Sequence, residues 1–326
     1  MKYTVIILVL STLMQVGYAQ NSPQKTDGQI PKNTFRDEIS ILNFYRQYSS
    51  FTDPGKYEYL YNNLPDSLLE LCSLIRSQFI HPFAELPKYR ELIPQERWDE
   101  MMNYPSVISI LEGLVSYDSA GLVFGRKPEN RLVLGCQQNA ILLASILKYR
   151  GVPARVRNGH ATYIAPGFHI SHTICEVWNK DEMRWMLVDP SMDMVDFSRD
   201  LFDFSNELWI KFQNGEIDPN LYGIPNRYTG LVSIVGKVCT DLSSILGTEY
   251  PIDQYAPILD DIFLNNQLSP KQIETLNKIC DLMILIDAEN ISELKVIYNN
   301  NPEIQITKSF GQISTNSDNS TGFRNN

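Results

Sequence analysis

Histidine is scarce in this chain, and its four copies are His81, His160, His169 and His172. A metal site would have to combine His169, His172 and Cys175, which follow one another at intervals of three. Residues three apart on a β-strand point to opposite faces, so these side chains cannot close around one ion. The sequence also has no glycine-rich phosphate loop. We therefore expect neither a metal nor another cofactor.

Basic residues are outnumbered, because 28 Lys and Arg face 38 Asp and Glu and leave a formal charge of −10. Nucleic acids and anionic lipids are bound through a basic footprint, so neither is an expected partner. Hydrophobic residues make up 43% of the 326 positions. A chain of this kind can bury a sizeable core in one large domain or two smaller ones.

The apolar run at the amino terminus, from Val5 to Leu13, is too short for a stable membrane span. It follows Lys2 and precedes small residues, which is the pattern of a cleaved signal peptide. Residues 1–19 are therefore predicted to be a signal peptide, with an uncleaved anchor as the alternative. The prediction implies export to the periplasm or the extracellular space, with no stable membrane anchor.

Polar segments bound the part of the chain that is predicted to fold. Residues 20–34 are predicted to form a flexible leader, and residues 306–326, rich in Ser, Thr and Asn, a disordered tail. Residues 35–305 contain no repeat and no clear linker, so they are predicted to form one domain with helical flanks. Within them, either Asp66 or Ser67 is expected to cap the start of a helix.

Five cysteines follow the predicted signal peptide, with a spacing that matches no disulfide framework: Cys72, Cys136, Cys175, Cys239 and Cys280. Their odd number leaves at least one thiol unpaired in each chain unless two chains are linked. Cys136 begins a helix that is predicted to extend to about Arg150. Gly151 can close this helix in the left-handed conformation, and Pro153 prevents its continuation. The middle of the helix is apolar almost all round, which predicts a buried helix.

A thiol at the amino end of a buried helix has a distinctive environment. Unpaired backbone N–H groups and the positive end of the helix dipole lower its pKa, and the same N–H groups can receive an oxyanion. Gly135 lets the backbone approach another group closely. The three amides that follow, Gln137, Gln138 and Asn139, are expected to meet exposed backbone groups or to line a cleft. Taken alone, Cys136 could also be a small buried hydrophobe or half of a disulfide.

Strand-forming residues follow the helix, in the segments 152–164, 172–178 and 184–189. The last two are predicted to form a hairpin. In its first strand His172, Ile174 and Glu176 share one face, so Cys175 is predicted to point away from His172.

The register of this hairpin brings a carboxylate toward the imidazole. If the turn centres on Lys180 and Asp181, the antiparallel pairing places His172 directly opposite Asp189. A carboxylate there would orient the imidazole and stabilise its protonated form, which in turn stabilises a thiolate.

Other polar residues near this hairpin have plainer interpretations. Glu176 is about 13 Å along the strand from His172, too far to bond its ring, so a salt bridge or a cleft edge is expected. Arg155 and Arg157 are expected in a solvated face or a structural ion pair rather than a substrate clamp. The tryptophans are expected in the core or in a cleft wall: Trp178, Trp185 and Trp209.

The order of Cys, His and Asp on a helix, a strand and the next strand resembles the transglutaminase-like superfamily of the papain-like fold. The matching stretches are GCQQNAILLASILKYRGVPARVRNG, SHTICEVW and RWMLVDPS. The resemblance covers most of residues 55–265 and is most specific in 131–191. It implies an α+β domain whose nucleophile helix is buried against an antiparallel sheet, with a core at about 131–195 and additional flanking helices.

The resemblance also implies a reaction at an amide bond of a protein or peptide. Cys136 would be the nucleophile, His172 the general base and acid, and Asp189 the orienting carboxylate. An amine acceptor gives transglutaminase chemistry and water gives peptidase or amidase chemistry. The triad is common to both, so the sequence leaves both open, together with a non-catalytic exported binding module on the same fold.

Two features of the family pattern are not matched by residues of this chain. Many members have Trp two positions after the catalytic histidine, where this chain has Ile174, so the preference for an acyl donor is not transferred. The second donor of an oxyanion hole is unassigned, because neither Gln78 nor Gln95 lies in a supporting motif. Neither the substrate nor the oligomeric state is specified by the pattern.

Overall fold

The computed structural model describes residues 32–310. The predicted signal peptide, residues 1–19, lies outside this range, as do residues 20–31 of the predicted leader and residues 311–326 of the predicted tail. The described end of the leader is helical, because helix α1 already begins at Lys32.

The prediction of a disordered tail from residue 306 was wrong at its start. Ile306 is buried in a cluster of carboxyl-terminal helices. Strand β11 (Lys308–Ser309) then pairs antiparallel with β10 (Gln254–Tyr255). Composition indicated a polar tail, whereas one apolar side chain and a two-residue ladder hold its first residues against the core.

Helices and strands alternate irregularly along the described chain. The helices are α1 (Lys32–Arg46), α2 (Leu68–Arg76), α3 (Leu86–Tyr89), α4 (Val107–Tyr117), α5 (Cys136–Tyr149), α6 (Ser205–Gln213), α7 (Leu231–Ile245), α8 (Ile258–Asn265), α9 (Pro270–Leu282) and α10 (Ala288–Asn300). The strands before β10 are β1 (Phe79–Ile80), β2 (Leu132–Val133), β3 (Ala154–Ala165), β4 (Phe168–Asn179), β5 (Arg184–Asp189), β6 (Met194–Val195), β7 (Phe202–Phe204), β8 (Tyr222–Ile224) and β9 (Tyr228–Thr229).

The main sheet has the strand order β6-β5-β4-β3-β7, and every neighbouring pair along this path is antiparallel. Strand β8 joins β4 in parallel and carries β9 as a short hairpin. Strands β1 and β2 form a separate parallel pair, and β2 leads directly into α5. The prediction of an α+β fold is confirmed.

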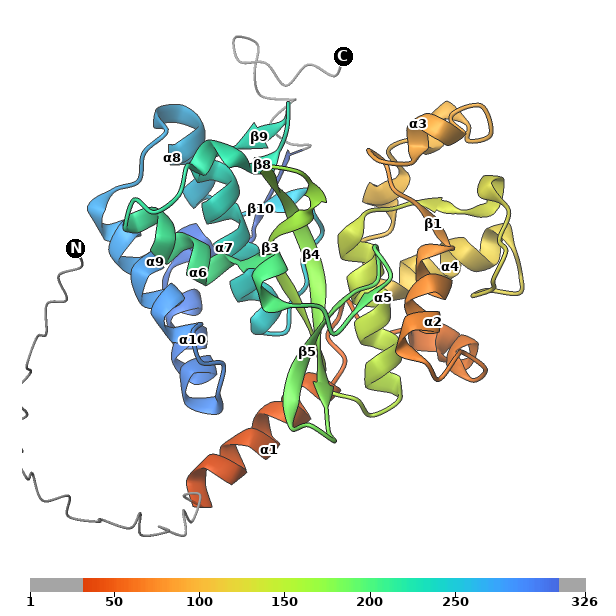
Figure 1. Ribbon diagram of the computed structural model, residues 1–326, viewed down its shortest axis with the longest axis horizontal. Coiled ribbons are helices and arrows are strands. Elements are labelled where there is room, and N and C mark those ends of the chain that lie inside the picture. The colour runs from red at the N-terminus through yellow and green to blue at the C-terminus, as the bar shows by residue number, and fades with distance from the viewer. Residues whose placement is uncertain (1–31, 311–326) are drawn as a thin grey trace, which may run out of the picture.

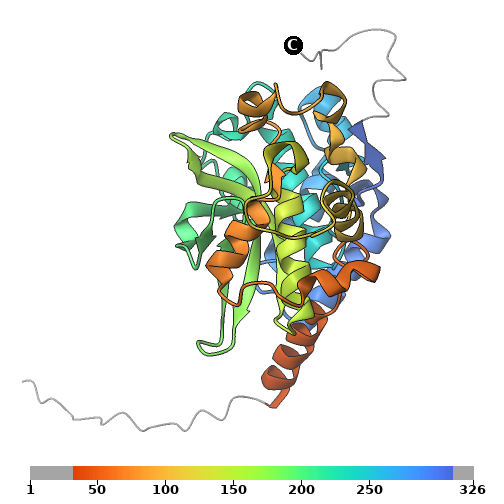
Figure 2. The same cartoon turned by 90° about the vertical axis from the view of Figure 1, so that its right-hand side faces the viewer.

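The long helix α5 packs against β3 and β4, and α7 packs against β3. Figure 1 shows α2, α4 and α5 beside one end of the sheet and α6 to α10 gathered at the other. Turned by 90° in Figure 2, α5 lies in front of the carboxyl-terminal helices, all of them on one side of the strands. The sheet therefore lies against two groups of helices, of which one contains α5 and the other α7.

The hydrophobic core contains two large clusters, one for each group of helices. One cluster joins α2, α4 and α5 to the sheet through residues such as Leu71, Leu142 and Val156. A second joins α1 to the carboxyl-terminal helices and includes the fully buried Trp209. Helix α2 begins at the predicted cap, because the Ser67 hydroxyl accepts a hydrogen bond from the backbone N–H of Glu70.

A buried charge network connects the sheet to α7. The Arg157 guanidinium donates to Glu176 at 2.7 Å and to the two oxygens of Asp241 at 3.1 and 3.0 Å. Arg155 donates to the same oxygen of Glu176 at 2.6 Å. Burial raises the pKa of Glu176, but the two arginines outweigh burial and lower the pKa to about 2. The expected ion-pair role of Glu176 and both arginines is confirmed.

Replacing Arg157 by methionine should lower the free energy of unfolding by about 3–5 kcal/mol, because Asp241 would keep its buried charge and lose its guanidinium partner. Urea denaturation of the purified protein measures this change. Arg184→Met is the matched control, since Arg184 forms an exposed pair with Asp196 and its loss should have a much smaller effect. Equal destabilisation by both substitutions would contradict a dominant role for the buried network.

Candidate active site

Cys136 is the first residue of α5, and its side chain is 6% exposed. The amides that follow it hold the backbone at this point. The Gln138 side-chain oxygen accepts from the N–H of Gly135 at 3.3 Å, and the Asn139 side-chain amide donates to the carbonyl of Gly135 at 2.9 Å. Gln137 donates to the backbone carbonyl of Tyr250. Two of the three amides thus fix the turn into the helix, and the third ties the helix start to the loop after α7.

His172 and Asp189 are in direct contact. The imidazole Nε2 lies 2.7 Å from Oδ2 of Asp189. The same oxygen accepts a hydrogen bond from the hydroxyl of Tyr163 at 2.7 Å, and Oδ1 accepts from the backbone N–H of Ser191 at 2.8 Å. The carboxylate is fully buried and the imidazole is 4% exposed. Three donors therefore hold Asp189, and its contact with Nε2 leaves Nδ1 of His172 free for another partner.

The contact does not arise from the predicted register. The ladder pairs Cys175 with Val188 and Trp178 with Trp185, so the turn lies one residue later than expected and the pairing is shifted by two. The prediction that His172 lies directly opposite Asp189 was wrong. A shift by two residues keeps every side chain on its face, so the two groups still meet, but along the diagonal between strands.

The predicted alternation of β4 is confirmed at two neighbouring residues. Cys175 belongs to the cluster that contains α5, and its thiol donates to the carbonyl of Ala140 at 3.2 Å. Ile174 belongs instead to a small cluster with Leu187 and Phe202. The position at which the family pattern often has Trp is therefore filled here by an apolar side chain away from α5.

Electrostatics favour the ionised form of the Cys136 thiol. Burial raises its pKa, but the charge of His172 and a hydrogen bond to the imidazole outweigh burial, and Lys237 acts in the same direction. The pKa is lowered to about 7. A substantial fraction of the thiol is consequently ionised near neutral pH.

The imidazole is shifted in the opposite direction. Burial lowers the pKa of His172, whereas the charges of Asp189 and Cys136 raise it, and the net result is a pKa of about 10. Burial raises the pKa of Asp189 and the charge of His172 lowers it, with a net decrease. Between about pH 7 and pH 10 the favoured state is therefore a thiolate beside an imidazolium, held by an ionised carboxylate.

Two residues of this environment, Tyr163 and Lys237, were not expected from the sequence. Tyr163 fixes the carboxylate. Lys237 lies on α7, 9% exposed, and donates to the side-chain oxygen of Asn158 at 3.4 Å. A signal was present for Lys237, because it interrupts the apolar run of LVSIVGKVC and a lysine there requires a polar partner inside the fold.

The other four cysteines are also free, and all are buried. Burial is the main cause that raises their pKa values, to about 12 for Cys72 and Cys239 and well above the ordinary range for Cys175 and Cys280. Among the five thiols, Cys136 alone has a lowered pKa.

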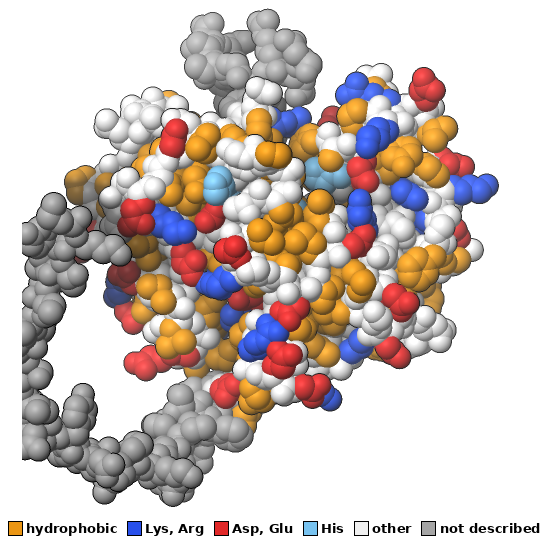
Figure 3. All heavy atoms as spheres, viewed as in Figure 1, with side chains coloured by type: hydrophobic (Ala, Val, Ile, Leu, Met, Phe, Trp, Pro, Cys, Tyr) orange, Lys and Arg blue, Asp and Glu red, His pale blue; other side chains and the backbone are white. Residues whose placement is uncertain are grey.

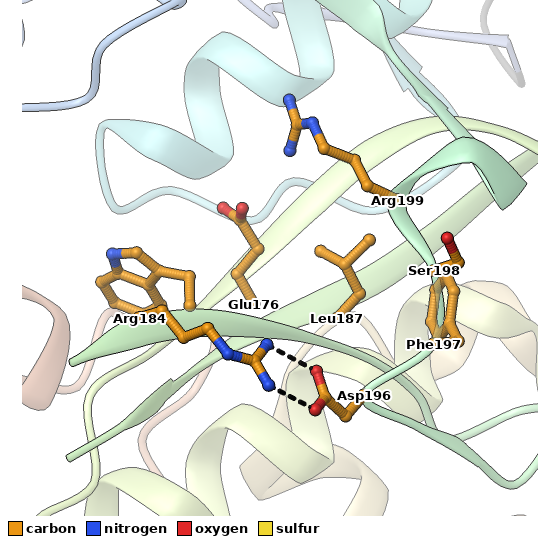
Figure 4. Close-up of a pocket in the computed structure, with 8 residues that line it drawn as sticks. Glu176, Arg184, Leu187, Asp196, Phe197, Ser198 and Arg199 are labelled. Carbon is orange, nitrogen blue, oxygen red and sulfur yellow. Dashed lines mark hydrogen bonds and ion pairs between the residues drawn. The ribbon is translucent and has the colours of Figure 1, made fainter. Parts of the chain in front are cut away.

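A surface hollow of about 360 Å³ lies elsewhere on the described residues. Figure 4 shows Glu176, Leu187 and Phe197 along it, with Arg184 paired to Asp196 at its edge. Glu176 is already bound by two arginines, and no cysteine or histidine lines the hollow. The smaller hollow also excludes Cys136. On the face drawn in Figure 3, acidic and basic side chains are interspersed among apolar ones.

Gln78 and Gln95, considered from the sequence as oxyanion donors, are placed unfavourably. The Gln78 amide nitrogen donates to the carbonyls of Leu74 and Val123 at 2.8 and 2.7 Å, and its oxygen accepts from Arg126. Gln78 is fully buried and fully engaged. Gln95 lies exposed at the start of a 3-10 turn.

Residues 32–310 contain no group of three or more His, Cys, Asp and Glu side chains arranged to hold a metal ion. None of the helices in this range has the length and apolar character needed to cross a bilayer.

Comparison with known proteins gives little guidance. No family model and no curated protein matches the chain. Among solved structures it is similar to a protein from Cytophaga hutchinsonii described as a "Putative Cysteine Protease", with 15% identity and a TM-score of 0.18. The match covers 40% of this chain and 45% of that one. An identity and a TM-score this low do not define a shared fold.

Proposed function

We propose that this protein is an exported thiol enzyme of the transglutaminase-like type, with Cys136, His172 and Asp189 as its catalytic triad. The observation that carries the proposal is the coupling of these groups: Cys136, with its lowered thiol pKa, interacts with His172, whose Nε2 lies 2.7 Å from a fully buried carboxylate. This combination distinguishes Cys136 from the other four cysteines, and it is the arrangement that thiol acyl transfer requires.

In the proposed reaction the Cys136 thiolate attacks the carbonyl carbon of an amide. The sulfur–carbon bond forms while the carbonyl π electrons move to oxygen, near the first N–H groups of α5 that have no acceptor within the helix. When this intermediate collapses, the carbon–nitrogen bond breaks and the His172 imidazolium gives its proton to the departing amine. The product is a thioester and a neutral imidazole.

The second half of the reaction regenerates the enzyme. Neutral His172 takes a proton from water or from a second amine as that nucleophile attacks the thioester. Collapse of the second intermediate releases a carboxylic acid or a new amide and returns the thiolate. Asp189 keeps its charge throughout and stabilises the imidazolium. The same residues serve both acceptors, so the proposal includes transglutaminase and peptidase or amidase activity.

One observation favours a second candidate, a binding module without turnover on the same fold. Cys136 is only 6% exposed, and neither of the two hollows described above includes it. A substrate must therefore reach a covered thiol.

The rate of alkylation of each cysteine by iodoacetamide, measured against pH by peptide mass spectrometry, separates the two candidates. Cys136 should be labelled with an apparent pKa near 7, while the four buried thiols of raised pKa stay slow and serve as internal controls. The acid limb of the Cys136 profile is the pH range in which its alkylation rate rises with pH. In His172→Ala this limb should move to higher pH, because the cation that lowers the thiol pKa against the effect of burial is lost. If Cys136 behaves like its four companions in both proteins, the binding module becomes the better account.

A further inference from the structure

His81 follows a strand that pairs with the segment leading into Cys136. Strand β1 pairs in parallel with β2, with Phe79 opposite Leu132 and Ile80 opposite Val133. The backbone N–H of Leu134 then donates to the carbonyl of Ile80 at 3.1 Å. His81 follows β1 directly, at the level of the residues that lead from β2 into Cys136. Pro82 restricts the backbone of His81 to extended conformations and maintains this direction.

The ring of His81 is held in one tautomer. Its Nδ1 accepts hydrogen bonds from the backbone N–H groups of Phe83 and Ala84, at 3.3 and 3.2 Å. An imidazole nitrogen that accepts carries no proton, so the proton lies on Nε2. The backbone N–H of His81 donates to Glu85 at 2.9 Å and closes the same loop. Nε2 has no hydrogen-bond partner within residues 32–310, and the residue is partly exposed.

The ring is also uncharged at neutral pH. Burial lowers the pKa of His81, and the positive charge of His172 acts in the same direction. The charges of Glu85 and Asp189 oppose the decrease, and the net pKa is about 4. The charges of both His172 and Asp189 thus act on this ring. At neutral pH it therefore presents an uncharged N–H donor that does not disturb the thiolate.

We propose that the Nε2–H of His81 is the second donor of the oxyanion hole, acting with the backbone N–H of Cys136. This inference rests on the proposed function. As the sulfur–carbon bond forms, the negative charge that develops on the carbonyl oxygen is received by these two donors. His81 keeps its proton throughout, and the charge returns to the carbonyl bond when the amine leaves. Such a donor acts on the transition state rather than on the thiol.

Two reagents separate this role from a structural one. Acylation by p-nitrophenyl acetate passes through a tetrahedral oxyanion, whereas alkylation by iodoacetamide displaces iodide and forms none. His81→Ala should lower the rate of Cys136 acylation about 10²-fold. Alkylation should change little, and its acid limb should stay in place because the ring carries no charge there. His81→Gln, which offers an amide N–H, should restore much of the acylation rate.

Phe83→Ala is the matched control for the loop, because the Phe83 ring packs edge-on to that of His81 while its backbone N–H provides the bond to Nδ1. It should leave the ratio of acylation to alkylation unchanged. An equal loss of both reactions in His81→Ala, or a shift of the acid limb, would overturn the role of His81. If neither reagent reacts rapidly with Cys136 in the unaltered protein, the proposed function itself fails, which is a different result.

Discussion

Replacing Cys136 by serine is expected to lower the rate of acyl transfer by at least about 10⁴-fold, since the proposed nucleophile is lost from a group that would act as a unit. A serine hydroxyl at this position stays protonated near neutral pH, because its pKa lies far above that of the thiol. The burst of p-nitrophenol released by p-nitrophenyl acetate measures acylation. Mass spectrometry of the peptide that contains residue 136 then identifies the acetylated atom.

Cys280→Ala is the control for this experiment. Cys280 is a buried thiol of the carboxyl-terminal helices with a strongly raised pKa, so its loss should leave the burst intact. Acetylation of another cysteine, or an undiminished burst from Cys136→Ser, would contradict the assignment of Cys136. Once the burst is established, adding a primary amine tests whether the thioester passes to an amine or to water.

Replacing Asp189 by asparagine is expected to lower the acylation rate by about 10³–10⁴-fold. Asp189 provides the largest charge that raises the pKa of His172 against burial. Without that charge the imidazole pKa falls, and the ring is neutral over more of the pH range. Its stabilisation of the thiolate is lost there, so the Cys136 pKa rises from about 7. The acid limb of the alkylation profile should therefore move to higher pH, in addition to the loss of rate.

Tyr163→Phe provides a matched comparison for Asp189→Asn. It removes one hydrogen bond to the carboxylate but leaves the charge in place. Its acid limb should shift much less than that of Asp189→Asn, and its loss of acylation should be smaller. If the two variants shift the limb equally, the hydrogen bond rather than the charge controls His172. If neither shifts it, Asp189 is not coupled to the thiol.

Local sequence signals were sufficient for the secondary structure around the site. The apolar run after Cys136, ended by Gly151 at a positive φ of 71°, gave helix α5 within a residue of its end. Alternation gave β4 and β5, and it placed Ile174 and Cys175 in different hydrophobic clusters. These features depend on neighbours a few positions apart, which is the range over which helix caps and strand periodicity act.

The sequence by itself determined that a cysteine begins a buried helix and that His172 and Asp189 share a face of one hairpin. The tertiary structure alone decided how they meet, since a two-residue change of register alters the partner without altering the face. It also decided which distant side chains complete the environment: Tyr163 on another strand, Lys237 on a later helix and His81 beside the helix start. Local periodicity contains no information on such contacts, because they form only when separate elements pack against one sheet.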